Sequence, residues 1–454
     1  MRAPILPNNP RAAAGLQGFT LKRNGALEPF MDKFVIRGGN PLVGTIRVSG
    51  AKNAALPCMA AAILTEEEVI LENIPDVRDI ETERKLLMAM GAEVELGNVG
   101  DHRTRINFRT LSSPEAKYEI VKTMRASSLV LGPLVARAGM ARVAMPGGCA
   151  IGGRPIDLHI KGLEKMGATI AQEHGYLEAR ADKLKGAHIV FDKITVTGTE
   201  DLLMAAVLAE GETLMENCAR EPEVCDLAAL LSAMGAKVEG AGTSTIRVQG
   251  VTSLGGARYC INPDRIEAGT FLIAGAITAG DLTIAHCNPD HLGAVISKLG
   301  EAGAKVEITA PDTVRVRSGG KLSAADISTE EYPGYPTDMQ AQYMALATQA
   351  DGVSIIKENI FENRFMHVQE LVRMGANIKV DGRTATVRGP APLSAAAVMC
   401  SDLRASASLV LAALVADGES FLDRVYHMDR GYERIEQKLE SVGAQIRRMG
   451  NVFG

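Results

Sequence analysis

The sequence predicts an α/β protein with two inside-out α/β domains, each made of three repeated strand-helix units with buried helices. Two observations carry this prediction. The pattern Leu-x-x-x-Gly-Ala-x-Val/Ile occurs six times, and short Ala-rich apolar segments recur at a similar spacing. Self-similarity at a fixed period marks a repeated supersecondary unit. The glycines of the pattern are Gly91, Gly167, Gly235, Gly303, Gly375 and Gly443.

The spacing of these glycines sets the size of the unit. Successive glycines lie 76, 68, 68, 72 and 68 residues apart. This is about twice the length of a helical-hairpin repeat, so each unit has room for several strands and helices. A chain of 454 residues is too long for one hydrophobic core. Six units therefore divide naturally into two domains of three.

The Ala-rich segments predict one buried helix in each unit. They are apolar almost all round, and a helix without a polar face belongs in an interior. Five of them run into a glycine, Gly139, Gly211, Gly280, Gly352 or Gly418, where we expect left-handed helix caps. The segments are residues 54–64, 127–138, 202–209, 270–279, 341–350 and 406–416.

The remaining elements of the unit are strands and a second, amphipathic helix. Strand-like stretches such as 69–72, 213–216, 282–285 and 354–357 follow the apolar segments. The amphipathic helix then ends at the repeated Gly-Ala, and strands such as 93–95 and 305–308 come next. The unit is therefore expected to run strand, helix, strand, helix, strand. A solenoid is the alternative architecture, but its helices are seldom so uniformly apolar.

Composition excludes several classes of function. The formal net charge is −5, whereas a nucleic-acid partner usually needs a basic face. No run of 18 apolar residues predicts a membrane span. Residues 1–30 lack the apolar core of a signal peptide, and we expect a disordered extension there, with Met31 as a plausible natural start.

The cysteine and histidine patterns point to a reduced compartment and to no metal centre. The seven cysteines include no C-x-x-C pair, which favours reduced thiols and a cytoplasmic location. The eight histidines show no H-E-x-x-H spacing, so a catalytic metal is not indicated.

Charged residues gather just before the predicted buried helices. Helix N-termini present free N–H groups and a partial positive charge, so they suit anionic ligands. A cation at such a position opposes the helix dipole and needs another reason, which favours a functional site. The alternative is that the acidic members only cap helices. The residues are Lys52, Asn53, Arg125, Lys193, Asp264, Arg265, Asp338, Asp402 and Arg404.

The most unusual segment is the Gly-rich stretch 145–155. Four glycines in seven residues surround Cys149 and lead to Arg154. Such a composition predicts an exposed loop, where a cysteine is uncommon because unreactive thiols are usually buried. An incidental thiol is the alternative. The stretch contains no G-x-G-x-x-G, and the chain has no P-loop, so phosphate binding would depend on Lys, Arg and helix ends.

Eight segments together resemble the enolpyruvyl transferase family, and within it the members that act on UDP-N-acetylglucosamine. The resemblance spans about residues 31–454. The segments are SGAKNAALP (49–57), VKTMRAS (121–127), PGGCAIGGRPIDLH (146–159), PDRIEAGTF (263–271), PTDMQAQ (336–342), FENRFMHV (361–368), DLRASASLVLA (402–412) and DRGYERIE (429–436).

The resemblance implies a fold and a reaction. It implies one domain of residues 52–262, and a second of residues 31–51 and 263–454. The expected reaction moves enolpyruvate from phosphoenolpyruvate to the 3′-hydroxyl of UDP-N-acetylglucosamine and releases phosphate, as the first committed step of peptidoglycan precursor synthesis, with no metal or other cofactor. A sister enzyme acting on shikimate 3-phosphate and a non-catalytic nucleotide-sugar sensor are the alternatives.

The same resemblance assigns roles to single residues. It implies that Cys149 donates a proton to the methylene carbon of phosphoenolpyruvate and is the thiol that fosfomycin alkylates, and that Asp338 is the general base. Contacts to phosphoenolpyruvate are implied for Lys52, Asn53, Arg154, Arg404 and Arg430. Contacts to UDP-N-acetylglucosamine are implied for Arg125, Arg154, Pro155, Ile156, Asp157, Leu158, Lys193, Ile194, Thr195, Val196, Asp338 and Ile360.

Two further residues have open roles. Asp402 matches another carboxylate of the family's cleft, and capping of a helix is its alternative. Arg364 is expected either to steady the same face of the cleft or to form a surface ion pair.

Overall fold

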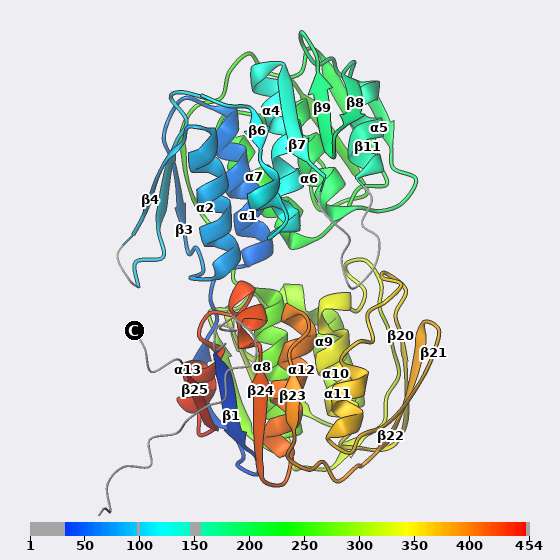
Figure 1. The fold of residues 1–454 in the computed structure, drawn as a ribbon. Coiled ribbons are helices and arrows are strands. Elements are labelled where there is room, and N and C mark those ends of the chain that lie inside the picture. The colour runs from blue at the N-terminus through cyan, green and yellow to red at the C-terminus, as the bar shows by residue number, and fades with distance from the viewer. Residues whose placement is uncertain (1–31, 98–99, 146–155, 451–454) are drawn as a thin grey trace, which may run out of the picture. The chain divides into compact units, whose positions relative to one another are not determined.

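The computed structural model describes residues 32–97, 100–145 and 156–450. The predicted extension 1–30 and the predicted site residues Cys149, Arg154 and Pro155 lie outside the described residues. The fold class is confirmed: helices form the interior and strands lie outside them. Figure 1 shows β3 and β4 outside α1 and α2, and β20, β21 and β22 outside α10 and α11.

Each of the six Ala-rich segments lies in a buried helix. Residues 266–277, for example, are buried without exception. Such helices need small side chains because other helices pack against them on several sides. The helices are α1 (Lys52–Ala61), α4 (Leu131–Ala138), α6 (Val196–Ala206), α8 (Arg265–Ile277), α10 (Gln340–Ala347) and α12 (Leu403–Val415).

The repeated pattern forms the C-terminal cap of the second helix in each unit. All six glycines adopt φ values between +89° and +113°. In every copy the amide of the following Ala donates to the carbonyl of the Leu, at 2.9–3.1 Å, which closes the helix in a Schellman motif. Each Leu is buried. The helices are α2 (Arg78–Met90), α5 (Asp157–Lys165), α7 (Pro222–Ala233), α9 (Gly293–Glu301), α11 (Val368–Arg373) and α13 (Ile435–Glu440).

Most of the glycines after the buried helices do not cap those helices, so the expectation of left-handed caps there was mostly wrong. Only Gly139 caps its helix directly in the left-handed conformation. Helix α6 ends at Ala206, before Gly211, and Gly352 lies inside β20 (Ala350–Lys357). Gly280 serves close approach instead, because a Cβ there would lie 2.3 Å from the carbonyl oxygen of Leu42.

The sheets contain one strand more per unit than predicted. Each sheet pairs a parallel edge strand, the strand after the buried helix, and an antiparallel pair that follows the second helix. In the first three units the orders are β14 (Ala257–Cys260), β3 (Val69–Glu72), β5 (Thr104–Asn107), β4 (Glu93–Leu96); β6 (Glu115–Ala116), β7 (Met140–Ala144), β9 (Tyr176–Arg180), β8 (Thr169–Glu173); and β10 (His188–Val190), β11 (Glu212–Glu216), β13 (Thr245–Gln249), β12 (Lys237–Glu239).

The other three sheets repeat this order, except that in the last sheet β1 supplies one strand of the antiparallel pair and only β25 follows the second helix. Their strands are β2 (Val43–Arg47), β15 (Asp281–Ala285), β17 (Thr313–Arg317), β16 (Lys305–Ala310); β18 (Leu322–Ser323), β20, β22 (Thr384–Gly389), β21 (Asn377–Asp381); and β23 (Ala397–Met399), β24 (Glu419–Asp423), β1 (Lys33–Arg37), β25 (Gln445–Met449). A short strand, β19 (Ile327–Ser328), also pairs with β20. The predicted unit had one strand after its second helix, whereas the sheets have an antiparallel pair at that position.

The two segments that connect residues 52–262 to the rest of the chain lie side by side. Ala51 donates its amide to the carbonyl of Asn262 at 2.8 Å, and Asp264 donates to Ser49 at 2.8 Å. Buried apolar residues form two separate clusters, one within 51–261 and one made of 34–48 and 266–446. The domain limits 52–262 and 31–51 with 263–454 stay a prediction.

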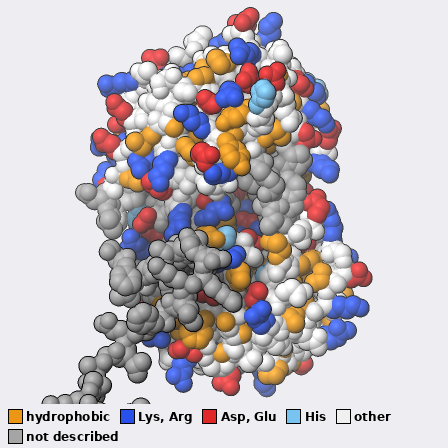
Figure 2. Space-filling view, viewed as in Figure 1, with side chains coloured by type: hydrophobic (Ala, Val, Ile, Leu, Met, Phe, Trp, Pro, Cys, Tyr) orange, Lys and Arg blue, Asp and Glu red, His pale blue; other side chains and the backbone are white. Residues whose placement is uncertain are grey.

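The surface is mixed in charge. Figure 2 shows Lys, Arg, Asp and Glu side chains interspersed over the visible face, with scattered hydrophobic side chains between them. No helix in the described ranges combines the length and apolar character that a membrane crossing requires.

The C-terminal cap at Gly303 predicts different effects on stability for two Gly→Ala substitutions at the end of α9. Gly303 has φ +89°, so Gly303→Ala should destabilise the protein by about 1–2 kcal/mol through backbone strain. Gly300 lies in the same helix with open space around its Cα, so Gly300→Ala should be neutral or stabilising by up to about 1 kcal/mol. Thermal melting of both variants checks this. A Gly303→Ala variant as stable as Gly300→Ala would contradict it.

Candidate active site

Asp338 is held by two arginines. It lies in the short helix η4 (Thr337–Met339), just before α10. Its Oδ1 accepts from Nη2 of Arg364 at 2.6 Å, and its Oδ2 lies 3.4 Å from Nε of Arg404. Arg364 is only 6% exposed, so the alternative of a surface ion pair was wrong. Two cations on one carboxylate favour its charged form, as a general base requires.

The acidic residues at helix starts divide into two groups. Asp264 caps α8 by accepting from the amides of Ile266 and Glu267, and Asp402 caps α12 in the same way. Asp402 therefore caps a helix, and its role as a carboxylate of the cleft stays a prediction. The start of α10 has no side-chain cap, so the carboxylate of Asp338 serves the arginines instead.

Arg404 is a buried cation with unused donors. It is 3% exposed, and its Nη1 and Nη2 have no hydrogen-bond partner among the described residues. The guanidinium lies 5.0 Å from the ring centroid of Tyr432 and its Nη2 lies 3.7 Å from Asp264. Burial lowers its pKa, but Tyr432 and the two nearby carboxylates outweigh burial and raise the pKa above its usual value. Buried donors without partners are costly, so this group is suited to an anionic ligand.

A second cluster joins Lys52, Asp79 and Arg430. Nζ of Lys52, the first residue of α1, lies 3.1 Å from Oδ2 of Asp79. Nε of Arg430, in η5 (Val425–Arg430), donates to Oδ1 at 2.9 Å. Burial lowers the pKa of Lys52, an effect that Asp79 opposes and that Arg404 reinforces. Burial raises the pKa of Asp79, but its two cations outweigh this and the pKa lies below its usual value.

The residues predicted to contact the nucleotide sugar begin two neighbouring helices. Ile156, Asp157 and Leu158 lie at the start of α5, and Lys193, Ile194, Thr195 and Val196 lie at the start of α6. Thr195 caps α6 by accepting from the amide of Gly198 at 3.1 Å. Buried His159 links the helices, because its Nε2 lies 3.3 Å from Oγ1 of Thr197 and its Nδ1 lies 3.2 Å from Oδ2 of Asp201.

The other predicted residues lie apart from this pair. Asn53 is half-buried in α1, beside Lys52. Ile360 follows β20, and its amide donates to Glu358 at 3.0 Å. Arg125 begins η2 (Arg125–Val130), and its side chain is not among those described.

Sequence reasoning missed Asp79, Tyr432 and Glu358 as partners of the site. An acidic residue in the first turn of a helix is ordinary, so the sequence gives no reason to select Asp79. Tyr432 lies in the DRGYERIE segment, but nothing in that segment predicts that its ring faces Arg404.

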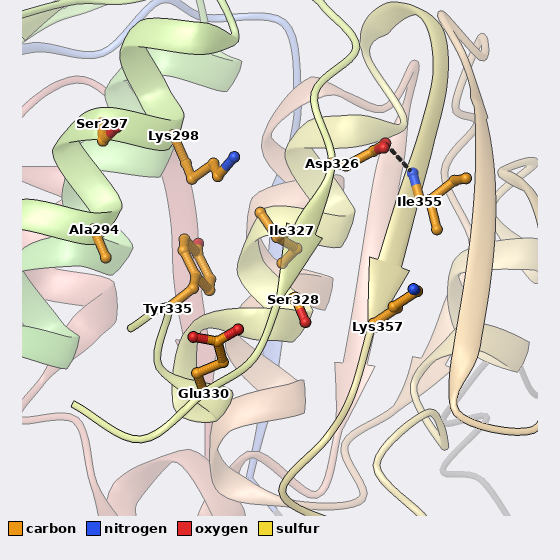
Figure 3. Close-up of a pocket in the computed structure, with 10 residues that line it drawn as sticks. All are labelled: Ala294, Ser297, Lys298, Asp326, Ile327, Ser328, Glu330, Tyr335, Ile355 and Lys357. Carbon is orange, nitrogen blue, oxygen red and sulfur yellow. Dashed lines mark hydrogen bonds between the residues drawn. The ribbon is translucent and has the colours of Figure 1, made fainter. Parts of the chain in front are cut away.

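A hollow of about 510 Å³ lies away from these residues. Figure 3 shows that α9 and the β19–β20 pair contribute its walls. Asp326 at its edge accepts from the amide of Ile355 at 2.7 Å. Its lining mixes Lys298 and Lys357 with Asp326 and Glu330, so the charges favour no single class of ligand. Among the described residues no group of three His, Cys, Asp or Glu side chains is placed to hold a metal ion.

The chain is similar to known proteins over nearly its full length. A family model described as EPSP synthase (3-phosphoshikimate 1-carboxyvinyltransferase) matches residues 36–439. The chain is 78% identical to a UDP-N-acetylglucosamine 1-carboxyvinyltransferase of Acidobacterium capsulatum, over 93% of this chain and 97% of that protein. It is 71% identical to the protein of the same name in Koribacter versatilis, over 93% of this chain and 98% of that protein.

Solved structures agree in fold. The enolpyruvyl transferase NikO from Streptomyces tendae matches with a TM-score of 0.83 and 26% identity, over 93% of this chain and 100% of that chain. An EPSP synthase from Acinetobacter baumannii matches with a TM-score of 0.69 over 92% of this chain and 100% of that chain. At 18% identity the second likeness concerns the fold alone.

Glu83 is a buried carboxyl group one helical turn beyond Asp79. It is 1% exposed, and neither of its carboxyl oxygens has a hydrogen-bond partner among the described residues. Burial, with a smaller contribution from Asp79, raises its pKa from 4.5 to about 8. The folded protein therefore keeps a proton at neutral pH that the unfolded chain releases.

This difference predicts a pH-dependent stability. Between about pH 4.5 and 8 the native state binds more protons than the unfolded state, so the stability contributed by Glu83 falls as pH rises. The stability of Glu83→Gln relative to wild type should therefore rise from pH 5 to pH 8, by on the order of a few kcal/mol.

Melting temperatures at the two pH values measure this effect. Glu81→Gln on the same helix is the control, since Arg84 lowers the pKa of Glu81 and its contribution changes little above pH 5. An equal difference between Glu83→Gln and wild type at both pH values would show that Glu83 is ionised in the folded protein.

Proposed function

The chain belongs to the enolpyruvyl transferase family, and on that basis we propose that it transfers enolpyruvate from phosphoenolpyruvate to the 3′-hydroxyl of UDP-N-acetylglucosamine, releasing phosphate. The observation that carries the choice of acceptor is the identity of 59–78% to relatives named for UDP-N-acetylglucosamine, over 92–93% of the chain. The reaction is the first committed step of peptidoglycan precursor synthesis. A cytoplasmic location stays a prediction from the cysteine pattern.

Asp338 is the proposed base. The sugar hydroxyl loses its proton to the carboxylate, and the oxygen attacks C2 of phosphoenolpyruvate. Arg364 and Arg404 position the carboxylate at 2.6 and 3.4 Å and favour its ionised form before the proton arrives. The same two cations make the carboxylate a weaker base. Its contribution to catalysis therefore comes from its position and from its ionised state.

Arg404, Lys52 and Arg430 are the proposed anion-binding groups. Phosphoenolpyruvate carries a carboxylate and a phosphate, and planar guanidinium groups pair with both in bidentate geometry. Arg404 supports this role best because two of its nitrogens are buried without a hydrogen-bond partner among the described residues. Lys52 and Arg430 share Asp79, so a bound anion would compete for cations that are already oriented.

Cys149 is the proposed proton donor, and it lies outside the described residues. In the proposed scheme the thiol protonates the methylene carbon as the sugar oxygen bonds to C2, which gives a tetrahedral adduct. Phosphate then leaves C2, and loss of a proton from the new methyl group restores the double bond. Arg154 and Pro155, also outside the described residues, belong to the proposed binding set.

Two alternative functions remain to be distinguished by experiment. The sister reaction uses shikimate 3-phosphate as acceptor, and the matching family model carries that description. A nucleotide-sugar sensor would bind UDP-N-acetylglucosamine without turnover.

Phosphate release from phosphoenolpyruvate with each acceptor separates these functions. We expect release with UDP-N-acetylglucosamine alone, and a loss of about a hundredfold or more in kcat for Cys149→Ala. Release with shikimate 3-phosphate would move the chain to the sister reaction. Tight binding of UDP-N-acetylglucosamine without release would support the sensor.

Asp338→Asn tests the base. We expect kcat to fall by about 10² to 10⁴-fold, because the amide cannot accept the proton, while calorimetry still detects UDP-N-acetylglucosamine binding. Asp326→Asn is a matched control, since an amide oxygen can still accept from Ile355 and the residue lies outside the site. A kcat for Asp338→Asn within threefold of wild type would exclude Asp338 as the base.

A further inference from the structure

Glu358 is a buried carboxylate between two segments of the proposed site. It follows β20 and is 1% exposed. Its Oε1 accepts from the amides of Ile360 and Phe361, each at 3.0 Å. Both of its carboxylate oxygens lie 2.9 Å from Oγ1 of Thr337, the residue before Asp338. One side chain therefore contacts both the segment of the proposed base and the segment of the proposed sugar contact.

The direction of these hydrogen bonds is fixed by chemistry. A guanidinium only donates, and Nη1 of Arg364 donates to Oγ1 of Thr337 at 2.7 Å. The hydroxyl of Thr337 has one proton, and the acceptor within reach of it is the carboxylate of Glu358. A continuous series follows: Glu358 accepts from Thr337, Thr337 accepts from Arg364, and Arg364 donates at 2.6 Å to Asp338.

Thr329 fixes Glu358 from the other side. It is fully buried, and its hydroxyl lies 3.0 Å from Oε1 of Glu358 while accepting from the amide of Asn359 at 2.9 Å. The amide of Thr329 also donates to the carbonyl of Lys357 at 2.9 Å. The carboxylate of Glu358 is thus held by backbone and hydroxyl donors, so it can fix the position of the Thr337 hydroxyl that accepts from Arg364.

We propose that Glu358 is a positioning residue that orients Asp338 through Thr337 and Arg364, and that holds the backbone at Ile360 with the same carboxylate. The inference rests on the proposed function, in which Asp338 is the base. Removing the hydroxyl of Thr337 leaves Arg364 with a buried donor unpaired and lets its guanidinium turn away from Asp338.

Two substitutions interrupt the series at different points. Thr337→Val removes the hydroxyl but keeps the shape of the side chain. Glu358→Gln removes the charge and replaces one of the two oxygens that lie 2.9 Å from the hydroxyl of Thr337 with an amide donor. Each should lower kcat about tenfold to a hundredfold and shift the acidic limb of the pH–rate profile upward, because Arg364 no longer favours ionised Asp338 as strongly. The double variant should be no worse than the worse single variant, since both act through Arg364.

Conservative and control variants separate positioning from simple stability. Thr337→Ser keeps the hydroxyl and should restore kcat to within about threefold of wild type. Thr278→Val removes a buried hydroxyl that donates to Ala274 at 2.8 Å in α8, and should leave the kinetics unchanged. Melting temperatures of all variants accompany the kinetics.

The outcomes distinguish this inference from the proposed function. Wild-type turnover with normal kinetics in Thr337→Val and Glu358→Gln would overturn the inference alone. Additive losses with an unchanged pH profile would also overturn it, because they indicate a merely structural role. No turnover by the wild type with UDP-N-acetylglucosamine would remove the proposed function, and the positioning role with it.

Discussion

The proposed site depends on pairing buried cations with carboxylates at the starts of the buried helices. Lys52, Arg265 and Arg404 occupy the first turns of α1, α8 and α12, where the helix dipole opposes a positive charge. Each has a carboxylate nearby: Asp79, Glu223 and Asp338 respectively. Removing one partner of such a pair leaves an uncompensated buried charge, which costs about 3–5 kcal/mol. An anionic substrate therefore meets cations whose position the fold already enforces.

The architecture was predictable because its signals are local. The buried Leu, the left-handed Gly and the following Ala lie within six residues. The same helix C-terminal motif can therefore be recognised six times along the chain. Uniformly apolar segments predicted buried helices for the same reason. The partners of β14, β2 and β1 were not predictable this way, because these strands pair with strands far away in sequence and no local pattern records their partners.

The candidate site was predictable in its residue types more than in its connections. Cations and carboxylates at helix starts indicated an anion site, and the resemblance selected Lys52, Asp338 and Arg404. The structure adds the contacts: Asp402 caps a helix, whereas Asp338 faces two arginines. Asp79 and Glu358 escaped notice because a single buried carboxylate has no sequence signature.

The distant pairing of the first strands has a consequence for synthesis on the ribosome. β2 cannot pair with β15 until residues 281–285 have emerged from the ribosome. β1 cannot pair with β24 and β25 until residues 419–449 have emerged. Phe34, Ile36 and Ile46, all buried in the folded protein, are therefore made before their partner strands and stay uncovered while more than 200 further residues are translated. Unpaired apolar strands invite aggregation. Residues 33–47 of the nascent chain are thus the segment that most needs protection until its partner strands have been made.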